Sequence, residues 1–204
     1  VTAMANPRTI HDFGGFPQAL FDVQYPAAGS PELAERVSEL IGGVHLDATD
    51  WGLDHGTWSV LCHAFPEADV PVVQLSIDMT KPGIWHYELA KRLKPLRDEG
   101  VLVCGSGNIV HNLRAYSWGD TGSEPYEWAV RFENEAKLLM ESNDHAPLAN
   151  YETMGSDAML SVPTPEHFLP LLYVLAQQTD DESVSFPVEG IDGASISMLT
   201  VRIG

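Results

Sequence analysis

The spacing of apolar residues along the chain predicts several amphipathic helices, the clearest of which begins at Ser30. Pro31 occupies the first helical position, and Leu33, Val37 and Ile41 recur at intervals of about one helical turn. The glycine pair at 42–43 follows directly and is typical of a helix C-terminus. We therefore predict one helix from residue 31 to the glycines.

The middle of the chain shows a pattern of strand, helix and strand. A β-branched run at 70–77 predicts a strand, and a short apolar run at 101–104 predicts a second strand of the buried type. Helical spacing over 82–99 lies between them. Because such units pair their strands side by side in the same direction, we expect a parallel pair.

The rest of the chain extends this pattern into an α/β domain. Residues 5–30 read as an ordered loop, 123–141 as a long helix and 142–165 as an irregular segment, followed by a helix from about Glu166. Two final strands, 183–188 and 195–203, are predicted to pair around 190–193. The expected fold is a single domain with a mixed, mostly parallel central sheet flanked by helices and an antiparallel strand pair at the C-terminal end.

Composition narrows the class of protein. The 204 residues are 44% apolar, which is enough for one core, and 29 acidic residues against 11 basic ones give a net charge of -18. Such a surface repels nucleic acid and anionic membranes. Cys62 and Cys104 lie in apolar runs and predict buried free thiols, and no apolar stretch has the length of a membrane span. We expect a cytoplasmic monomer or small homo-oligomer.

Three histidines occupy short motifs that suit a metal or proton-transfer site. They are His55 in LDHG (53–56), His111 in GSGNIVHN (105–112) and His167 in PTPEH (163–167). Neutral imidazole binds zinc, iron, copper and nickel, and it exchanges protons near neutral pH. The motifs therefore predict one site assembled from the three residues.

Each histidine also has a plainer interpretation. His111 follows a glycine-rich turn at the expected carboxyl end of a strand, where α/β sheets bind ligands, although a tight turn beside a core histidine fits equally. The glycine spacing matches neither a P-loop nor a dinucleotide motif. His167 lies in a predicted first helical turn, whose dipole favours the neutral ring, or it faces solvent in a capping segment. Asp54 either orients His55 or caps the following helix.

The sequence signals for other catalytic residues are weaker. Cys104 precedes the glycine turn, where a nucleophile can sit, but Ser106 lacks the surroundings of a nucleophile elbow, so a serine or cysteine hydrolase is the minority interpretation. We interpret four further histidines as structural: His45, His63, His86 and His145.

Five motifs together resemble a known family. They are HDFGGFP (11–17), WGLDHGTW (51–58), QLSID (74–78), GNIVHNL (107–113) and PTPEH (163–167). In this order they resemble the 4,5-DOPA extradiol dioxygenases, which belong to the class III extradiol ring-cleavage family related to the catalytic subunit of protocatechuate 4,5-dioxygenase. The resemblance covers essentially the whole chain and implies one catalytic domain over residues 1–204.

The resemblance implies a chemistry for the three histidines. It implies that the chain opens a catechol such as DOPA between ring carbons 4 and 5 with O2, at non-haem Fe(II), with zinc as the alternative metal. His167 is implied as a metal ligand, His111 as a ligand or as the acid and base, and His55 as a group facing the substrate. Glu166 and Glu189 are weaker carboxylate candidates for the metal.

One departure from the family keeps other functions open. The family motifs Gly-His-Gly-x-Pro and Ser-x-His-Trp, which carry two metal-binding histidines, do not occur in the 204 residues. The N-terminal strand-loop unit of the family is therefore expected to be absent. The alternatives are a zinc-dependent hydrolase and a non-catalytic metal-binding protein on the same scaffold.

Overall fold

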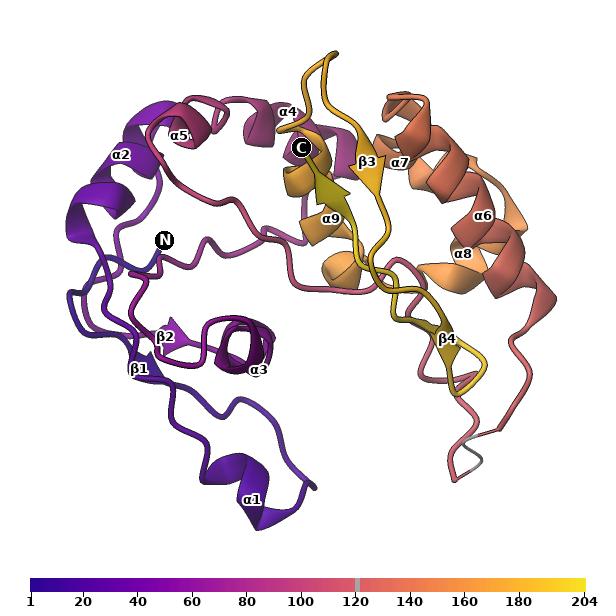
Figure 1. Cartoon of the computed structure of the whole chain (residues 1–204), viewed down its shortest axis with the longest axis horizontal. Helices are drawn as coiled ribbons and strands as arrows, with labels where there is room; N and C mark the ends of the chain where they lie inside the picture. The colour runs from indigo at the N-terminus through magenta and orange to yellow at the C-terminus, as the bar shows by residue number, and fades with distance from the viewer. Residues whose placement is uncertain (120–121) are drawn as a thin grey trace. The chain divides into compact units, whose positions relative to one another are not determined.

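The computed structural model describes residues 1–119 and 122–204, which form two compact units, Val1–Ser76 and Ile77–Gly204 (Figure 1). The first unit contains β1 (Arg8–Thr9), α1 (Gln18–Phe21), α2 (Pro31–Ile41), β2 (Gly52–Leu53) and α3 (His55–Ala64). The second contains α4 (Gly83–Lys91), α5 (Pro95–Asp98), α6 (Glu127–Glu141), α7 (Ala146–Ala149), the 3-10 helix η1 (Tyr151–Thr153), α8 (Ser156–Ser161), the 3-10 helix η2 (Pro165–His167), α9 (Leu169–Leu175), β3 (Val184–Ser185), β4 (Ile191–Asp192), β5 (Ile196–Ser197) and β6 (Arg202–Ile203).

The helix predicted from Ser30 is confirmed as α2. The Ser30 side chain accepts a hydrogen bond from the backbone N–H of Leu33 at 3.2 Å, which satisfies one of the free donors of the first turn. Gly42 ends the helix with φ at 88°, a left-handed conformation that costs glycine little. Val37 and Ile41 are buried, as their spacing predicted.

The described strands form small two-stranded sheets, with parallel pairing in the first unit and antiparallel pairing in the second. In the first unit β1 pairs in parallel with β2, with Arg8 opposite Gly52. In the second unit β3 pairs with β6 and β4 with β5, both antiparallel. The mixed α/β character and the antiparallel pairing at the C-terminal end are confirmed. Within the part of the chain that the structure describes, regular parallel pairing is limited to the two short strands of the first unit.

The prediction of two regular strands in the middle of the chain is wrong. Residues 70–77 are held by separate hydrogen bonds, such as Thr2 N–H to the Gln74 carbonyl at 3.0 Å, and form no ladder. Residues 101–104 are not a buried strand either, because Leu102 is 70% exposed. The prediction of buried thiols fails with it, since Cys104 is exposed and Cys62 half-buried. An apolar, β-branched run favours an extended backbone, but a regular strand also needs a neighbouring strand with which to pair.

Prolines explain where the helices differ from their predicted bounds. The pattern at 82–99 divides into α4 and α5 at Pro95, which lacks the N–H needed to continue a helix. Helix α6 begins at Glu127 rather than at residue 123, because Pro125 disfavours helical geometry at the residue before it. The segment 142–165 is more regular than predicted and contains α7, η1 and α8. The helix expected from Glu166 is the 3-10 turn η2 followed by α9.

The core of the second unit holds the chain next to two candidate histidines. Helix α4 packs on α9 and α6 packs on α8, and these helices bury Phe132 and Leu172 (Figure 1). Val110 and Phe168 are fully buried in the same cluster. These two residues directly adjoin His111 and His167, so the core fixes the backbone at both. No helix in the described ranges is long and apolar enough to cross a membrane.

Candidate active site

The second unit brings His111 and His167 together. Their imidazole rings are stacked with centroids 3.5 Å apart and planes 12° from parallel. The backbone N–H of His111 donates to the Ser161 carbonyl at 2.8 Å, and the carbonyl of His167 accepts from Asn108 N–H at 2.9 Å. The segment before His111 is thus tied directly to the turn that carries His167.

The glycine-rich turn makes this approach sterically feasible. A Cβ atom on Gly107 would lie 2.1 Å from the carbonyl oxygen of His167, and one on Gly105 would lie 2.5 Å from that of Pro170. Real Cβ atoms essentially never come so close to a backbone atom. The glycines therefore let two backbones meet, and no phosphate is needed to explain them.

Asn112 fixes the chain immediately after His111. Its side-chain oxygen accepts from the backbone N–H groups of Arg114 and Ala115, at 3.1 and 3.2 Å, and its Nδ2 donates to the Leu160 carbonyl at 2.8 Å. Its own backbone exchanges hydrogen bonds with Ser195 of the C-terminal hairpin. A histidine followed by an asparagine that closes its own turn is the sequence signal for this positioning.

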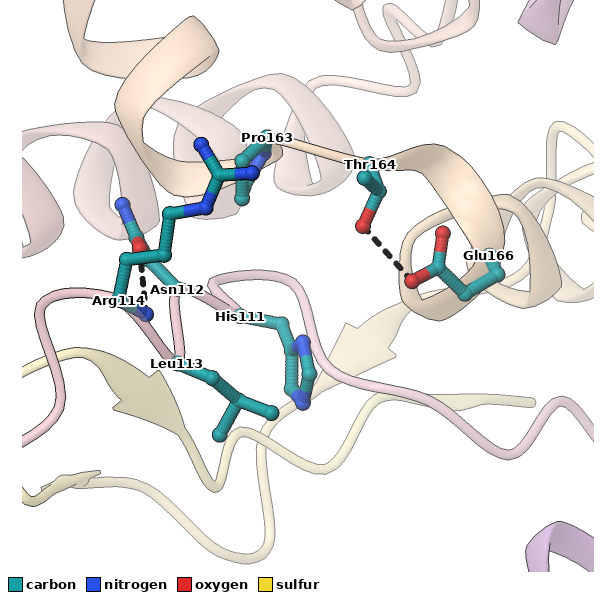
Figure 2. A pocket seen from close by; sticks show the side chains of 7 residues that line it. All are labelled: His111, Asn112, Leu113, Arg114, Pro163, Thr164 and Glu166. Carbon is teal, nitrogen blue, oxygen red and sulfur yellow. Dashed lines mark hydrogen bonds between the residues drawn. The ribbon is translucent and has the colours of Figure 1, made fainter.

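A cavity of about 160 Å³ adjoins His111 (Figure 2). Its lining comes from two segments: His111, Asn112, Leu113 and Arg114 from one, and Pro163, Thr164 and Glu166 from the other. Thr164 Oγ1 donates to Glu166 Oε1 at 2.7 Å, and the buried Glu166 Oε2 has no hydrogen-bond partner in the described parts of the chain. Burial lowers the pKa of His111, and the nearby Glu166 carboxylate opposes this only in part, so the neutral ring is favoured at neutral pH.

A metal would find suitable donors here but an incomplete ligand set. Two imidazoles and a carboxylate with an unpartnered oxygen are donors that iron and zinc accept. The lone pairs of two nearly parallel rings, however, run side by side and do not converge on one ion. No group of three or more His, Cys, Asp or Glu side chains gathers at one point in the described residues of either unit.

His55 lies in the first unit, at the start of α3. Asp54 caps this helix by accepting from Thr57 N–H at 3.3 Å, which settles its role as a cap. The carboxylate that holds His55 is Asp12: its Oδ1 lies 2.8 Å from Nδ1 of the ring and accepts from the backbone N–H at 3.1 Å. Burial alone would raise the pKa of Asp12, but the hydrogen bonds from His55 outweigh it and hold that pKa below its usual value.

Asp12 is a functional candidate that the sequence did not reveal. It lies in HDFGGFP, 43 residues before His55, and the parallel contact of β1 with β2 helps to bring the two segments side by side. Phe13, the next residue, sets its ring edge-on against that of His55 with centroids 5.6 Å apart. The prediction that His55 joins the other two histidines in one site stays a prediction.

Two of the histidines interpreted as structural are buried in the second unit. His86 Nδ1 lies 2.9 Å from the Tyr173 hydroxyl and Nε2 lies 3.0 Å from the Asp78 carbonyl. His145 Nδ1 lies 3.0 Å from the hydroxyl of Tyr87. Both ring nitrogens of His86 are therefore satisfied, whereas the buried Nε2 of His145 has no hydrogen-bond partner in the described parts of the chain.

The family model described as the catalytic LigB subunit of aromatic ring-opening dioxygenase matches residues 1–196, and the chain belongs to this family. Enzymes of the family open aromatic rings and depend on a metal.

Individual relatives agree with this assignment. The chain is 52% identical over 210 residues to the 4,5-DOPA dioxygenase extradiol of Escherichia coli (strain K12), covering all of this chain and 76% of that protein. It is 36% identical over 193 residues to the protein of the same name from Beta vulgaris, covering 93% of this chain and 71% of that one. A crystal structure of an uncharacterized protein from Escherichia coli K12 has the same fold, with a TM-score of 0.84, 45% identity, and coverage of 100% and 79%.

Proposed function

We propose that this chain is the catalytic part of an extradiol dioxygenase that opens a catechol such as DOPA between ring carbons 4 and 5, with both atoms of O2 entering the product. The observation that carries the proposal is the stacked pair of His111 and His167 beside a cavity, in a chain of a ring-opening family. The relatives named 4,5-DOPA dioxygenase extradiol support DOPA as the substrate.

The arrangement supports distinct tasks for the two stacked rings. Because parallel imidazoles cannot aim at one ion together, we assign His167 to the metal first and His111 to proton transfer, with a ligand role for His111 as the second assignment. A metal, when bound, supplies the electronic link between catechol and O2. The metal we propose is non-haem Fe(II), with zinc as the alternative.

Proton transfer falls to His111 first and to His55 second. A catechol hydroxyl must lose its proton before the ring becomes electron-rich enough to react with O2, and a neutral imidazole is a suitable acceptor. The protonated ring can then return the proton as the aromatic ring opens. At His55 the contact with Asp12 occupies Nδ1 and leaves Nε2 for such a transfer.

The wider assignments are proposals as well. The family model extends over both compact units, which supports one catalytic domain, and the parallel pairing of β1 with β2 supports a mostly parallel central sheet. The free state of both cysteines supports a cytoplasmic location. We propose a monomer or small homo-oligomer as the active form.

The test is turnover by the full-length gene product that contains this chain. The protein is stripped of metal, reloaded with Fe(II) or Zn(II), and incubated with DOPA in air and under nitrogen. A yellow semialdehyde absorbing in the visible should form only with Fe(II) and O2. Unchanged substrate across several catechols contradicts the proposal, and hydrolysis of esters by the zinc form under nitrogen would favour a hydrolase instead.

The two stacked histidines are tested with matched variants. His111→Ala and His167→Ala should each abolish ring opening, whereas His63→Ala, at an exposed position of α3, should leave it unchanged. Metal content separates the tasks, because His167→Ala should lose bound metal and His111→Ala should retain it. Loss of metal from both variants would instead make His111 a ligand.

A further inference from the structure

Arg114 is an exposed basic residue at the candidate active site. It lines the cavity beside His111, yet its guanidinium has no ion pair and no hydrogen bond within residues 1–119 and 122–204. Most other basic side chains of the second unit bind a protein oxygen: Lys91, Lys94, Arg97, Arg131 and Lys137. A guanidinium in this position, at the edge of the candidate active site, can bind an anionic group of a ligand.

The backbone of Arg114 is held in place while its side chain is not. Asn112 Oδ1 accepts the N–H of Arg114 at 3.1 Å, and Asn112 itself is tied to the Leu160 carbonyl. Figure 2 shows the Arg114 side chain extending toward Pro163, with the ring of His111 and the carboxylate of Glu166 beyond it in this view. The guanidinium therefore has a fixed origin three residues after the proposed proton acceptor.

The charge of the chain makes this cation more significant. A net charge of -18 repels anionic ligands in general, so an anionic substrate needs a local positive group to bind. Glu166 lines the same cavity, and its carboxylate forms no ion pair with Arg114. The guanidinium fork matches a carboxylate better than any other side chain does, because it offers two parallel N–H donors.

We propose that Arg114 binds the carboxylate on the side chain of the substrate, so that the enzyme selects catechols with an anionic side chain over those without one. This inference rests on the proposed ring-opening function and deepens it. With a catechol ring beside His111, Arg114 is the basic residue of the cavity lining available to the far end of the substrate. Arg114 thus determines specificity and takes no part in proton transfer.

The experiment compares three catechols that differ only in their side chains. DOPA carries a carboxylate and an ammonium, dopamine carries the ammonium alone, and 3-(3,4-dihydroxyphenyl)propionate carries the carboxylate alone. In the Fe(II)-loaded full-length protein, Arg114→Met should raise KM for the two carboxylates about ten-fold, the loss expected for one charge-assisted hydrogen-bonded pair near the surface. The kcat values and the KM for dopamine should not change.

Two further variants sharpen the comparison. Arg114→Lys keeps the charge without the fork and should raise KM for the carboxylates about three-fold. Arg202→Met removes an exposed arginine of β6 in the same unit and should change none of the values. Raised salt should weaken the wild-type preference for carboxylates, because exposed ion pairs are screened.

The possible results are distinguishable. An equal KM change for all three catechols, or none, overturns the role of Arg114 and leaves the ring-opening function intact. Turnover of no catechol by the wild-type protein contradicts the proposed function and this inference together. Circular dichroism identifies any variant that fails to fold, and the lysine variant then decides the question.

Discussion

Replacing Asp12 by Asn should slow catechol ring opening while leaving the fold unchanged. Asp12 Oδ1 accepts from the backbone N–H of His55 and lies 2.8 Å from Nδ1 of its ring. An asparagine oxygen can accept both hydrogen bonds, so the ring orientation survives. What disappears is the negative charge that stabilises the ring when it takes up a proton.

The size of the effect follows from the exposure of the pair. A hydrogen bond to a charged group contributes about 1.5 to 3 kcal/mol and one between neutral groups about 1 kcal/mol. The His55 side chain is 50% exposed and that of Asp12 26%, so solvent screening keeps the charged hydrogen bond at about 2 kcal/mol, which is about 1 kcal/mol more than a neutral one. A loss of about 1 kcal/mol corresponds to a kcat about five-fold lower. Asp12→Ala removes the whole contact, worth about 2 kcal/mol, and should lower kcat about thirty-fold.

The assay is steady-state ring opening of DOPA by the Fe(II)-loaded full-length protein at fixed pH and O2. The effect should fall on kcat with KM nearly constant, since the pair acts on proton transfer and not on substrate binding. Asp22→Asn is the matched control, because Asp22 is an exposed carboxylate of the same unit that accepts one hydrogen bond from Gln18. An unchanged kcat in both Asp12 variants, or a loss that follows thermal stability, would refute the positioning role.

Three further predictions concern stability, each measured by denaturant unfolding. Ser30→Ala removes the cap of α2 and should cost about 1 kcal/mol, whereas Ser30→Gly should cost only a few tenths; equal losses would contradict the capping contact. Gly107→Ala should cost about 1 to 3 kcal/mol, because its Cβ would meet the His167 carbonyl oxygen, while Gly14→Ala, with open space around it, serves as the control. Burial holds the pKa of His86 below its usual value of 6.5, so the stability it contributes is complete above that pH and is lost as pH falls through it, by at most about 1.4 kcal/mol per pH unit. A His86→Gln variant with an equally steep loss between pH 7.5 and 5.5 would exclude His86 as a source.

Local signals in the sequence sufficed where the physical cause was local. The helix from Ser30 to Gly42 was predictable because its cap, its first proline and its terminal glycine all act within one turn of the residues they affect. The break at Pro95 follows from the same kind of local rule, although the helical spacing of apolar residues on either side predicts one continuous helix. The lack of regular strand pairing at 70–77 and 101–104 was not predictable, since pairing depends on a neighbour distant in sequence.

The same distinction between local and distant causes applies to the residues of the candidate site. The sequence allows Asp54 either to orient His55 or to cap the following helix, and the structure shows that it caps the helix. That Asp12 holds the ring did not follow, because nothing in the sequence shows which of 29 acidic residues lies beside it. The adjacent Asp54 is an obvious candidate partner for His55. Adjacent side chains at the start of a helix commonly point apart, however, and the Asp54 carboxylate caps the helix instead.

The glycine turn at 105–107 shows how one pattern admits two physical causes. Glycines after an apolar run suggest a ligand whose phosphate approaches the backbone, and they equally suggest a second backbone that must come close. The structure places the carbonyls of His167 and Pro170 where the Cβ atoms would be, so the second cause accounts for both glycines. Because the contact is between backbones, it fixes the distance between the chain before His111 and the turn bearing His167 without using either imidazole. The stacked geometry of the two rings is therefore set by backbone contacts on either side of the site.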